Sequence, residues 1–249
     1  MWSERQAIEL FHLVFVVHLG RRVDKALFAI KGGSNLRFYC KSIRYSEDID
    51  FDIRTMAPAT LENNVNTILD SATLATELKA KQITIEHVTS AKQSGTTQRW
   101  KLGIQLDGGA VIPTKIEFSR RGLDPEVKLE AADADLVRMY ALFPVLAQHY
   151  SDEAAFRQKI VALAKRNETQ ARDIFDLKLL LDRGTGQTKL PAVVKKEVGP
   201  AIEKAMTIGF DEFSGQVRAY LVPEYYDYYD RAMWETLQAE VVGKLEKLK

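Results

Sequence analysis

Three acidic side chains alternate with apolar ones in the segment Asp48-Ile-Asp-Phe-Asp-Ile53. Successive side chains of a β-strand point to opposite faces, so the pattern predicts a strand with Asp48 and Asp50 on one face and apolar side chains toward a core. Two carboxylates about 7 Å apart repel each other unless a cation lies between them. Mg²⁺ takes oxygen ligands of this kind and completes its shell with phosphates and water. The pair therefore indicates a magnesium site for a phosphorylated substrate.

A glycine-serine turn precedes this strand in the chain. The apolar run 26–30 predicts a buried strand that stops at Gly32-Gly33, where backbone without side chains can turn tightly or approach a ligand. Ser34 supplies a hydroxyl and a predicted N-cap for a short helix over 35–40. Free backbone N–H groups and the helix dipole favour an anion at such a helix start. The turn is therefore a candidate phosphate-binding site.

Each of these two signals also has an ordinary structural explanation. Glycine and serine are common turn residues, and alternating acids are typical of an exposed strand face. Found in this order, with a predicted strand at each, the two signals together favour a phosphate and metal site.

The surrounding segments resemble a known enzyme family. A glycine-serine turn followed by Asp-x-Asp resembles the signature of the nucleotidyltransferase superfamily built on the polymerase-beta-like fold. Three longer segments are similar to the abortive-infection toxin nucleotidyltransferases of the AbiEii/AbiGii type, to which the MenT toxins are related: Lys31 to Arg37, Arg44 to Phe51, and Arg172 to Leu177. The resemblance runs from about residue 26 to about residue 181 and is most specific where all three segments coincide.

A third acid is expected beside the first two. A helix is predicted from Leu61 to about residue 79, and strands are predicted at 82–90, 98–106 and 111–119. In the last of these, Glu117 lies on the face opposite its two apolar neighbours. The resemblance implies a third metal-binding acid on a neighbouring strand, and Glu117 takes that place. An exposed strand glutamate is the alternative.

The resemblance also assigns residues in the helical second half of the chain. In the family pattern a lysine approaches the nucleotide phosphates, and a following Arg-Asp-x-x-Asp segment shapes the site. The matching residues are Lys159, Arg172, Asp173 and Asp176, and Arg37 at the end of the first segment is expected beside the phosphates. The ordinary alternative is that Asp173 complements a helix dipole and that Arg172 and Asp176 form a surface pair.

The composition is that of an ordinary globular protein. The 249 residues are 46% hydrophobic with a net charge of +1, which indicates neither disorder nor a dominant polyanion-binding surface. The single cysteine, Cys40, excludes an internal disulfide and a cysteine-rich zinc site and suits a reducing compartment. No membrane span or secretion signal is expected, so we expect a cytoplasmic protein.

We expect an α/β (α+β) fold in two domains. Residues 1–125 are expected to form a polymerase-beta-like nucleotidyltransferase core with a mixed, mainly antiparallel sheet, ending at the turn 122–125. Residues 126–249 are expected to form a helical C-terminal domain that closes the nucleotide site.

The implied reaction transfers a nucleoside monophosphate from an NTP to an acceptor hydroxyl. Asp48, Asp50 and Glu117 are expected to hold Mg²⁺, or Mn²⁺ in its place, and Lys159 to neutralise the triphosphate, with Asp176 supporting the site. As the toxin of a toxin-antitoxin or phage-defence system, the protein is expected to modify RNA, first the tRNA 3′ end, and to have a cognate antitoxin. A local cationic surface for RNA is expected from five residues: Arg37, Lys41, Arg44, Arg120 and Arg121.

Two other functions stay open at this point. The acceptor hydroxyl can belong to a protein or a small molecule. A different class is a non-catalytic nucleotide- or RNA-binding module, which has no need to keep Asp48, Asp50 and Ser34 together.

Overall fold

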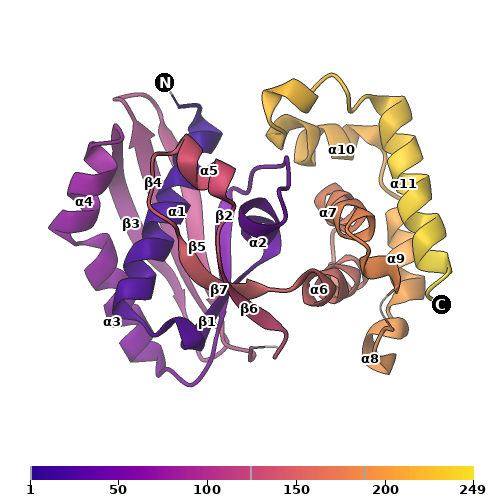
Figure 1. Cartoon of the computed structure of the whole chain (residues 1–249), viewed down its shortest axis with the longest axis horizontal. Helices are drawn as coiled ribbons and strands as arrows, with labels where there is room; N and C mark the ends of the chain where they lie inside the picture. The colour runs from indigo at the N-terminus through magenta and orange to yellow at the C-terminus, as the bar shows by residue number, and fades with distance from the viewer. Residues whose placement is uncertain (1, 124, 188) are drawn as a thin grey trace. The chain divides into compact units, whose positions relative to one another are not determined.

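A computed structural model describes residues 2–123, 125–187 and 189–249. The chain divides into two compact units, whose elements are labelled in Figure 1. Unit 1 contains residues 1–41 and 45–150, and unit 2 contains residues 42–44 and 151–249. The predicted boundary between residues 125 and 126 therefore falls inside unit 1. Asp124, in the turn expected there, lies outside the described residues.

Unit 1 combines a seven-stranded sheet with helices. Its elements in chain order are α1 (Glu4–Arg22), η1 (Lys25–Leu27), β1 (Phe28–Lys31), α2 (Gly32–Tyr39), β2 (Asp48–Ile53), α3 (Pro58–Leu69), α4 (Ala72–Lys79), β3 (Ile83–Gln93), β4 (Thr97–Leu106), β5 (Val111–Ser119), β6 (Val127–Ala131), α5 (Ala134–Met139) and β7 (Leu146–Tyr150).

The strands lie in the order β3-β4-β5-β2-β1-β7-β6. The pairs β2–β5 and β1–β7 are parallel. The other four described pairs are antiparallel. The predicted α/β fold with a mixed, mainly antiparallel sheet is confirmed. In this strand order β2 and β5, which carry the predicted acids, are direct neighbours.

Aromatic packing decides which face of the central strands is buried. Phe51 of β2 stacks on Phe118 of β5, with ring centroids 4.7 Å apart, and also contacts Phe15 of α1 and Phe28 of β1. All four side chains are fully buried. Because side chains alternate along a strand, burying Phe51 turns Asp50 and Asp52 toward the opposite face.

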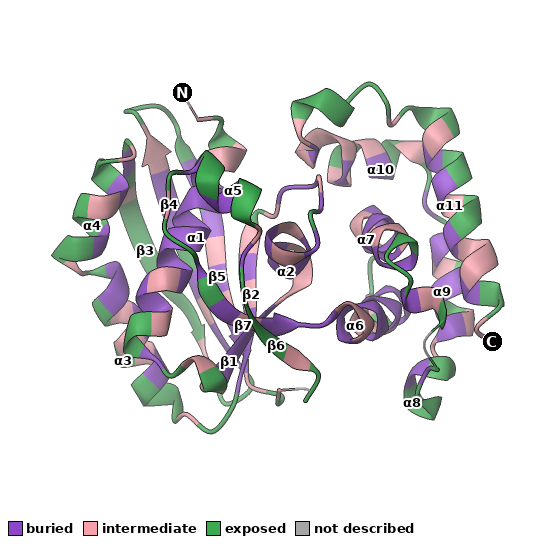
Figure 2. Ribbon diagram, in the orientation of Figure 1, coloured by how far each residue is buried: buried purple, intermediate pink, exposed green. Residues whose placement is uncertain are grey.

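The helix α1 is the central helix of the core of unit 1. Figure 2 shows buried residues along most of its length, whereas α3 and α4 keep exposed outer faces. A helix that is buried on nearly all sides tolerates polar residues only where they have partners. Glu9 fits this rule, since its carboxylate accepts from Arg37 and from the Tyr140 hydroxyl.

Two short strands explain why unit 1 extends past the predicted boundary. β6 pairs with β7, and β7 pairs with β1, so both strands complete the sheet. Residues 126–249 were expected to be helical, and the strands β6 and β7 correct that expectation. Whether the helical part closes the nucleotide site stays a prediction.

Unit 2 is helical. Its elements are α6 (Asp152–Lys165), α7 (Ala171–Asp182), η2 (Thr185–Gln187), α8 (Ala192–Lys195), α9 (Val198–Ala205), α10 (Phe210–Gln216), η3 (Arg218–Tyr220), η4 (Pro223–Tyr225) and α11 (Arg231–Glu246). Phe213 and Trp234 stack in its core with centroids 4.5 Å apart. The segment 42–44 joins this unit through a bridge between Arg44 and Leu221.

None of the described helices has the length and apolar character that crossing a bilayer requires. Cys40 is buried and carries a free thiol.

Candidate active site

The three predicted metal-binding acids lie on adjacent strands. In the parallel pairing of β2 with β5, Asp48 lies opposite Lys115 and Asp50 lies opposite Glu117. All three acids are partly exposed. Ile49, which lies between Asp48 and Asp50, and Phe51, which follows Asp50, are fully buried. The sheet register therefore brings together the carboxylates that the sequence separates by about 70 positions.

Asp50 is acted on by the charges of both other acids. Burial raises the pKa of its carboxyl group, and the nearby carboxylates of Asp48 and Glu117 raise it further, against the opposing effect of Lys31 and Lys115. Among the described residues, none gives the Asp50 carboxylate a hydrogen bond or an ion pair. A carboxylate without a partner beside two others is the arrangement that a cation stabilises.

Cations already accompany the other acids. The Lys115 Nζ lies 2.6 Å from Asp48 Oδ2, and the Arg99 Nε lies 2.6 Å from Glu117 Oε2. Lys31 Nζ lies 2.6 Å from Asp52 Oδ1. The other oxygen of Asp52 accepts from the Tyr150 hydroxyl, which marks Asp52 as a structural carboxylate rather than a further metal ligand.

The donor set fits a hard divalent cation such as Mg²⁺ or Mn²⁺. Asp48, Asp50 and Glu117 offer only carboxylate oxygens, which such ions prefer. In the described part of the chain, no three acidic, imidazole or thiol groups are gathered closely enough to enclose a metal ion. Asp48 and Glu117 instead hold cationic side chains, so the same carboxylates have to exchange partners before they hold a metal.

The glycine-serine turn leads directly into a helix. α2 begins at Gly32, earlier than predicted, and no side chain caps its N-terminus at Lys31. Gly32 has φ +68°, and a Cβ atom there would lie 3.1 Å from Asp50 Oδ2. Glycine is required for both reasons. The free N–H groups of this helix start and the Asp50 carboxylate thus lie next to each other.

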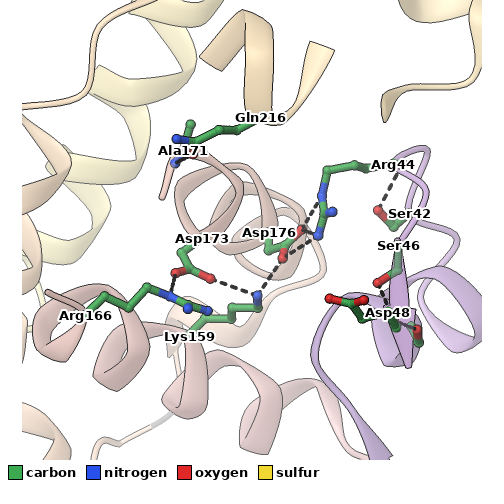
Figure 3. Close-up of polar contacts among 11 residues, drawn as sticks. Ser42, Arg44, Ser46, Asp48, Lys159, Arg166, Ala171, Asp173, Asp176 and Gln216 are labelled. Atoms are coloured by element: carbon green, nitrogen blue, oxygen red, sulfur yellow. Dashed lines mark hydrogen bonds and ion pairs between the residues drawn. The ribbon is translucent and has the colours of Figure 1, made fainter. Parts of the chain in front are cut away.

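Ser34 does not have the predicted N-cap role. Its hydroxyl is buried within the first turn of α2 and donates to the Asp48 carbonyl over 2.8 Å. The Ser46 hydroxyl donates to the same carbonyl over 2.9 Å (Figure 3). The two serines therefore fix the backbone where β2 begins, and with it the position of Asp48. Only the backbone N–H of Ser34 remains for the predicted phosphate contact.

Lys159, Asp173 and Asp176, three of the four residues predicted in the helical half, belong to a buried ionic network in unit 2 (Figure 3). The Lys159 Nζ lies 3.0 Å from Asp173 Oδ1 and 2.7 Å from Asp176 Oδ2. Arg166 contacts the second oxygen of Asp173 over 2.6 Å, and Arg44 contacts Asp176 over 3.0 Å. Both aspartates are fully buried. The surface ion pair between Arg172 and Asp176 that served as the alternative is therefore absent among these described contacts.

Electrostatics keep this network charged. Burial lowers the pKa of the Lys159 ammonium, but the carboxylates of Asp176 and Asp173 outweigh burial and hold that pKa above its usual value. Burial likewise raises the pKa of Asp173, and Lys159 with Arg166 outweighs it and holds the pKa below its usual value. Lys159 and Asp173 therefore stay ionised within a network of three basic and two acidic side chains.

A sequence profile described as nucleotidyl transferase AbiEii toxin, Type IV TA system, matches residues 14–214. The chain belongs to this family. It is a nucleotidyltransferase of the toxin class, as the resemblance implies. The match includes the acidic face of the sheet, the glycine-serine turn and the ionic network of the helical unit.

Solved structures share the fold. JHP933 from Helicobacter pylori is 18% identical with a TM-score of 0.63, and the alignment covers 99% of this chain and 95% of that one. MenT4, a nucleotidyltransferase toxin from Mycobacterium tuberculosis, is 15% identical with a TM-score of 0.62, and the alignment covers 100% of this chain and 95% of that one. No curated protein matches the sequence significantly.

Two predicted phosphate-binding arginines have different surroundings in this AbiEii-family chain. Arg37 is half-buried, its Nε lies 2.5 Å from Glu9 Oε1, and its guanidinium lies over the Tyr45 ring. Burial lowers the pKa of Arg37, but Glu9 outweighs burial and the pKa is raised. Arg172 is half-buried and has no hydrogen bond or ion pair with another described residue. Arg172 is the better placed of the two to bind an anion.

Four of the five basic residues expected to form an RNA surface have polar or ionic partners within the fold. Lys41 pairs with Asp133 over 3.2 Å, and Arg120 donates to Gln98 and to the Met56 carbonyl. Arg37 and Arg44 pair with the acids described above, and Arg121 is exposed. Most of this expected cationic surface is therefore engaged in contacts within the fold.

Sequence reasoning missed the cations that accompany the acids. Lys115 and Glu117 are two residues apart in a predicted strand, so the sequence already placed them on one face. Arg99 was also within a predicted strand, but its position opposite Glu117 depends on the register of β4 with β5. Nothing local in the sequence indicates that Arg44 pairs with Asp176.

Proposed function

We propose that this chain transfers a nucleoside monophosphate from an NTP to an acceptor hydroxyl at the face formed by Asp48, Asp50 and Glu117. The observation that carries this proposal is the Asp50 carboxylate, which has a raised pKa, no ionic partner among the described residues, and the uncapped start of α2 beside it. A metal-triphosphate complex supplies what both features lack, namely positive charge for the acids and an anion for the helix start.

The residues have distinct roles in this reaction. Asp48, Asp50 and Glu117 hold the metal, and the N–H groups of Gly33 and Ser34 bind a phosphate. When bound, Mg²⁺ neutralises triphosphate charge and polarises the reacting oxygens. The acceptor hydroxyl oxygen forms a bond to the α-phosphorus and releases its proton to solvent water, while the bond from that phosphorus to the bridging oxygen breaks and pyrophosphate leaves.

The helical unit is proposed to support the nucleotide. Lys159, Arg172, Asp173 and Asp176 match the family pattern. The ion-pair network of Lys159, Arg44 and Arg166 with Asp173 and Asp176 has one more cation than carboxylates. An excess of positive charge favours an anionic ligand. Arg172, without a described partner, is the residue we propose to contact it directly.

The proposed acceptor is RNA, with the tRNA 3′ end as the first candidate. Support comes from membership in a toxin family of nucleotidyltransferases, since blocking an RNA that translation requires arrests growth. An unpaired 3′ terminus also offers an accessible hydroxyl and is recognised by shape rather than by a duplex code. The proposed setting is the cytoplasm, where NTPs, tRNA and a cognate antitoxin are all available.

A labelling experiment tests the proposal. The pure protein is incubated with each α-³²P-labelled NTP, Mg²⁺, total RNA and cell protein, and the labelled species are separated on a gel. A labelled tRNA band is expected with at least one NTP, and its loss in EDTA is expected. Label on a protein band with unaltered tRNA would move the acceptor to a protein hydroxyl, and no label with any NTP would support a binding module.

Two variants separate the metal site from the fold. Asp50→Asn removes one carboxylate and is expected to lower labelling by at least about 10³ while leaving the circular dichroism spectrum unchanged. Asp107→Asn, in the exposed turn between β4 and β5, is the matched control and keeps full labelling. Near-wild-type labelling by folded Asp50→Asn would show that the metal assignment is wrong.

A further inference from the structure

The acids of the candidate active site are held by cations in fixed positions. Lys115 lies opposite Asp48 in the β2–β5 pair, and Arg99 lies opposite Glu117 in the β4–β5 pair. Directly opposite residues share a face and have neighbouring Cβ atoms. These contacts are therefore set by backbone register, which keeps Lys115 beside the acids even when its ammonium changes partner.

The contact of Lys115 with Asp48 competes with metal binding. Its Nζ lies 2.6 Å from Asp48 Oδ2, which is the position that a divalent ion needs for coordination by that oxygen. Lys115 also acts on Asp50, since its charge opposes the rise in the pKa of that group. A metal ion bound by Asp48 and Asp50 and a Lys115 ammonium still held 2.6 Å from Asp48 Oδ2 repel each other strongly.

The side chain has room to move. Lys115 is 31% exposed and Asp48 28% exposed, so neither is locked by packing. The flexible stem of lysine carries a compact, mobile charge with three donors. Lys159, in contrast, is enclosed by two buried carboxylates that already neutralise it.

We propose that Lys115 is a further substrate-binding cation of this enzyme. Its ammonium pairs with Asp48 before metal and nucleotide bind, and it changes partner to the triphosphate when they bind. The inference rests on the proposed function, because it requires a metal-triphosphate at these acids. Only the partner of the Lys115 side chain changes in this exchange. The exchange keeps the acids neutralised in the empty site and provides a cation for the phosphates in the filled one.

A purely structural role for Lys115 predicts a different behaviour. If the ammonium only holds β2 against β5, removing it weakens the acidic face and metal binding falls together with nucleotide binding. An exchanging cation gives changes of opposite sign: metal alone binds more tightly without its competitor, and the nucleotide complex binds more weakly without its phosphate contact.

The test uses the full chain and Mn²⁺ as the metal probe. Isothermal titration calorimetry measures Mn²⁺ affinity without nucleotide, and then the affinity of the Mn²⁺-loaded protein for the α,β-methylene analogues of the four NTPs, which cannot release pyrophosphate. For Lys115→Met we expect about tenfold tighter Mn²⁺ binding and about tenfold weaker binding of the preferred analogue. Lys115→Gln, also neutral, is measured alongside, and Lys115→Arg is expected to stay within about threefold of wild type for the analogue.

Lys101→Met is the matched control. Lys101 lies directly opposite Lys115 on β4 but is exposed and contacts none of the three acids through a described ion pair, so both affinities are expected to be unchanged. Mn²⁺ affinity that is unchanged or weaker in both neutral Lys115 variants, or unchanged analogue affinity, would overturn the inference. Equal Mn²⁺ binding by wild type and Asp50→Asn would instead overturn the metal site, and with it the proposed function.

Discussion

Arg44 and Asp176 are 132 residues apart in the chain, yet their side chains form a buried ion pair in unit 2. The Arg44 Nη2 lies 3.0 Å from Asp176 Oδ2, and Arg44 Nε lies 3.3 Å from Oδ1, so the guanidinium contacts both oxygens. The same carboxylate receives Lys159. The pair fixes the short segment 42–44 within the helical unit, although the residues on either side of that segment belong to unit 1.

Removing Arg44 is expected to destabilise the protein. Arg44→Met leaves Asp176 buried with one cation fewer, and breaking one side of a buried pair costs about 3–5 kcal/mol. Urea unfolding followed by circular dichroism measures the loss. The control is Arg138→Met, whose pair with Asp135 is exposed and whose loss is expected to cost no more than about 0.5 kcal/mol. Equal midpoints for the two variants would show that the Arg44 contact adds nothing to stability.

Local pattern predicted the centre of unit 1. The alternation at β2 placed Phe51 in the core and the acids on the other face, because burial enforces a period of two. The strands predicted at 98–106 and 111–119 also form and pair as a hairpin, whose turn has positive φ at Asp107 and Gly108, as short hairpin turns favour. These features depend on neighbouring residues alone, and local sequence is sufficient to specify them.

Features that depend on distant residues were not predictable in the same way. β6 alternates apolar and polar residues, but it has only five residues and is largely exposed, so its own sequence does not show which strand it pairs with. β7 is defined by its pairing with β1 far back in the chain. The ion pairs of Arg44 and Arg99 depend on tertiary packing and sheet register, respectively. The sequence therefore indicated which residues carry charge, while the fold decides which charges meet.

Lys159 offers a test of both its structural and its proposed catalytic role. Lys159→Met removes the cation shared by Asp173 and Asp176, so a loss of about 3–5 kcal/mol is expected in urea unfolding. If Lys159 also contacts the triphosphate, the labelling rate per folded molecule is expected to fall by roughly 10² to 10³. The rate is measured at a temperature where the variant is folded. Reduced stability with an unchanged rate would assign Lys159 to structure alone.

The pH dependence of stability is expected to depend on His12. Its Nε2 lies 2.8 Å from the Thr114 hydroxyl, which itself donates to the Glu47 carbonyl, so the Thr114 oxygen accepts from His12 Nε2–H. Burial lowers the pKa of His12 from 6.5 to about 3. Between these values the unfolded chain binds a proton that the folded chain does not, so stability falls as the pH falls from 6.5 toward 3.

Replacing the histidine is expected to remove this part of the dependence. His12→Gln keeps a donor toward Thr114 but does not titrate, so its stability is expected to fall less between pH 6.5 and 4, by about 3 kcal/mol relative to wild type. Urea midpoints at a series of pH values measure the difference in slope. His87→Gln, at an exposed position of β3, makes the same exchange of histidine for glutamine and serves as the control for the substitution itself. Parallel curves for wild type and His12→Gln would contradict the assignment.

Gly32 is the residue where backbone conformation and the acidic face meet. Its φ of +68° is strained for any residue with a Cβ atom, and a Cβ there would lie 3.1 Å from Asp50 Oδ2. Gly32→Ala is therefore expected to lower stability by about 1–2 kcal/mol and, by displacing the Asp50 carboxylate, to weaken Mn²⁺ binding about tenfold. The control is Gly243→Ala within α11, where a Cβ meets no atom within 4 Å and a helical alanine adds up to about 1 kcal/mol of stability. Weaker stability with unaltered Mn²⁺ affinity in Gly32→Ala would show that this glycine serves the turn and not the metal site.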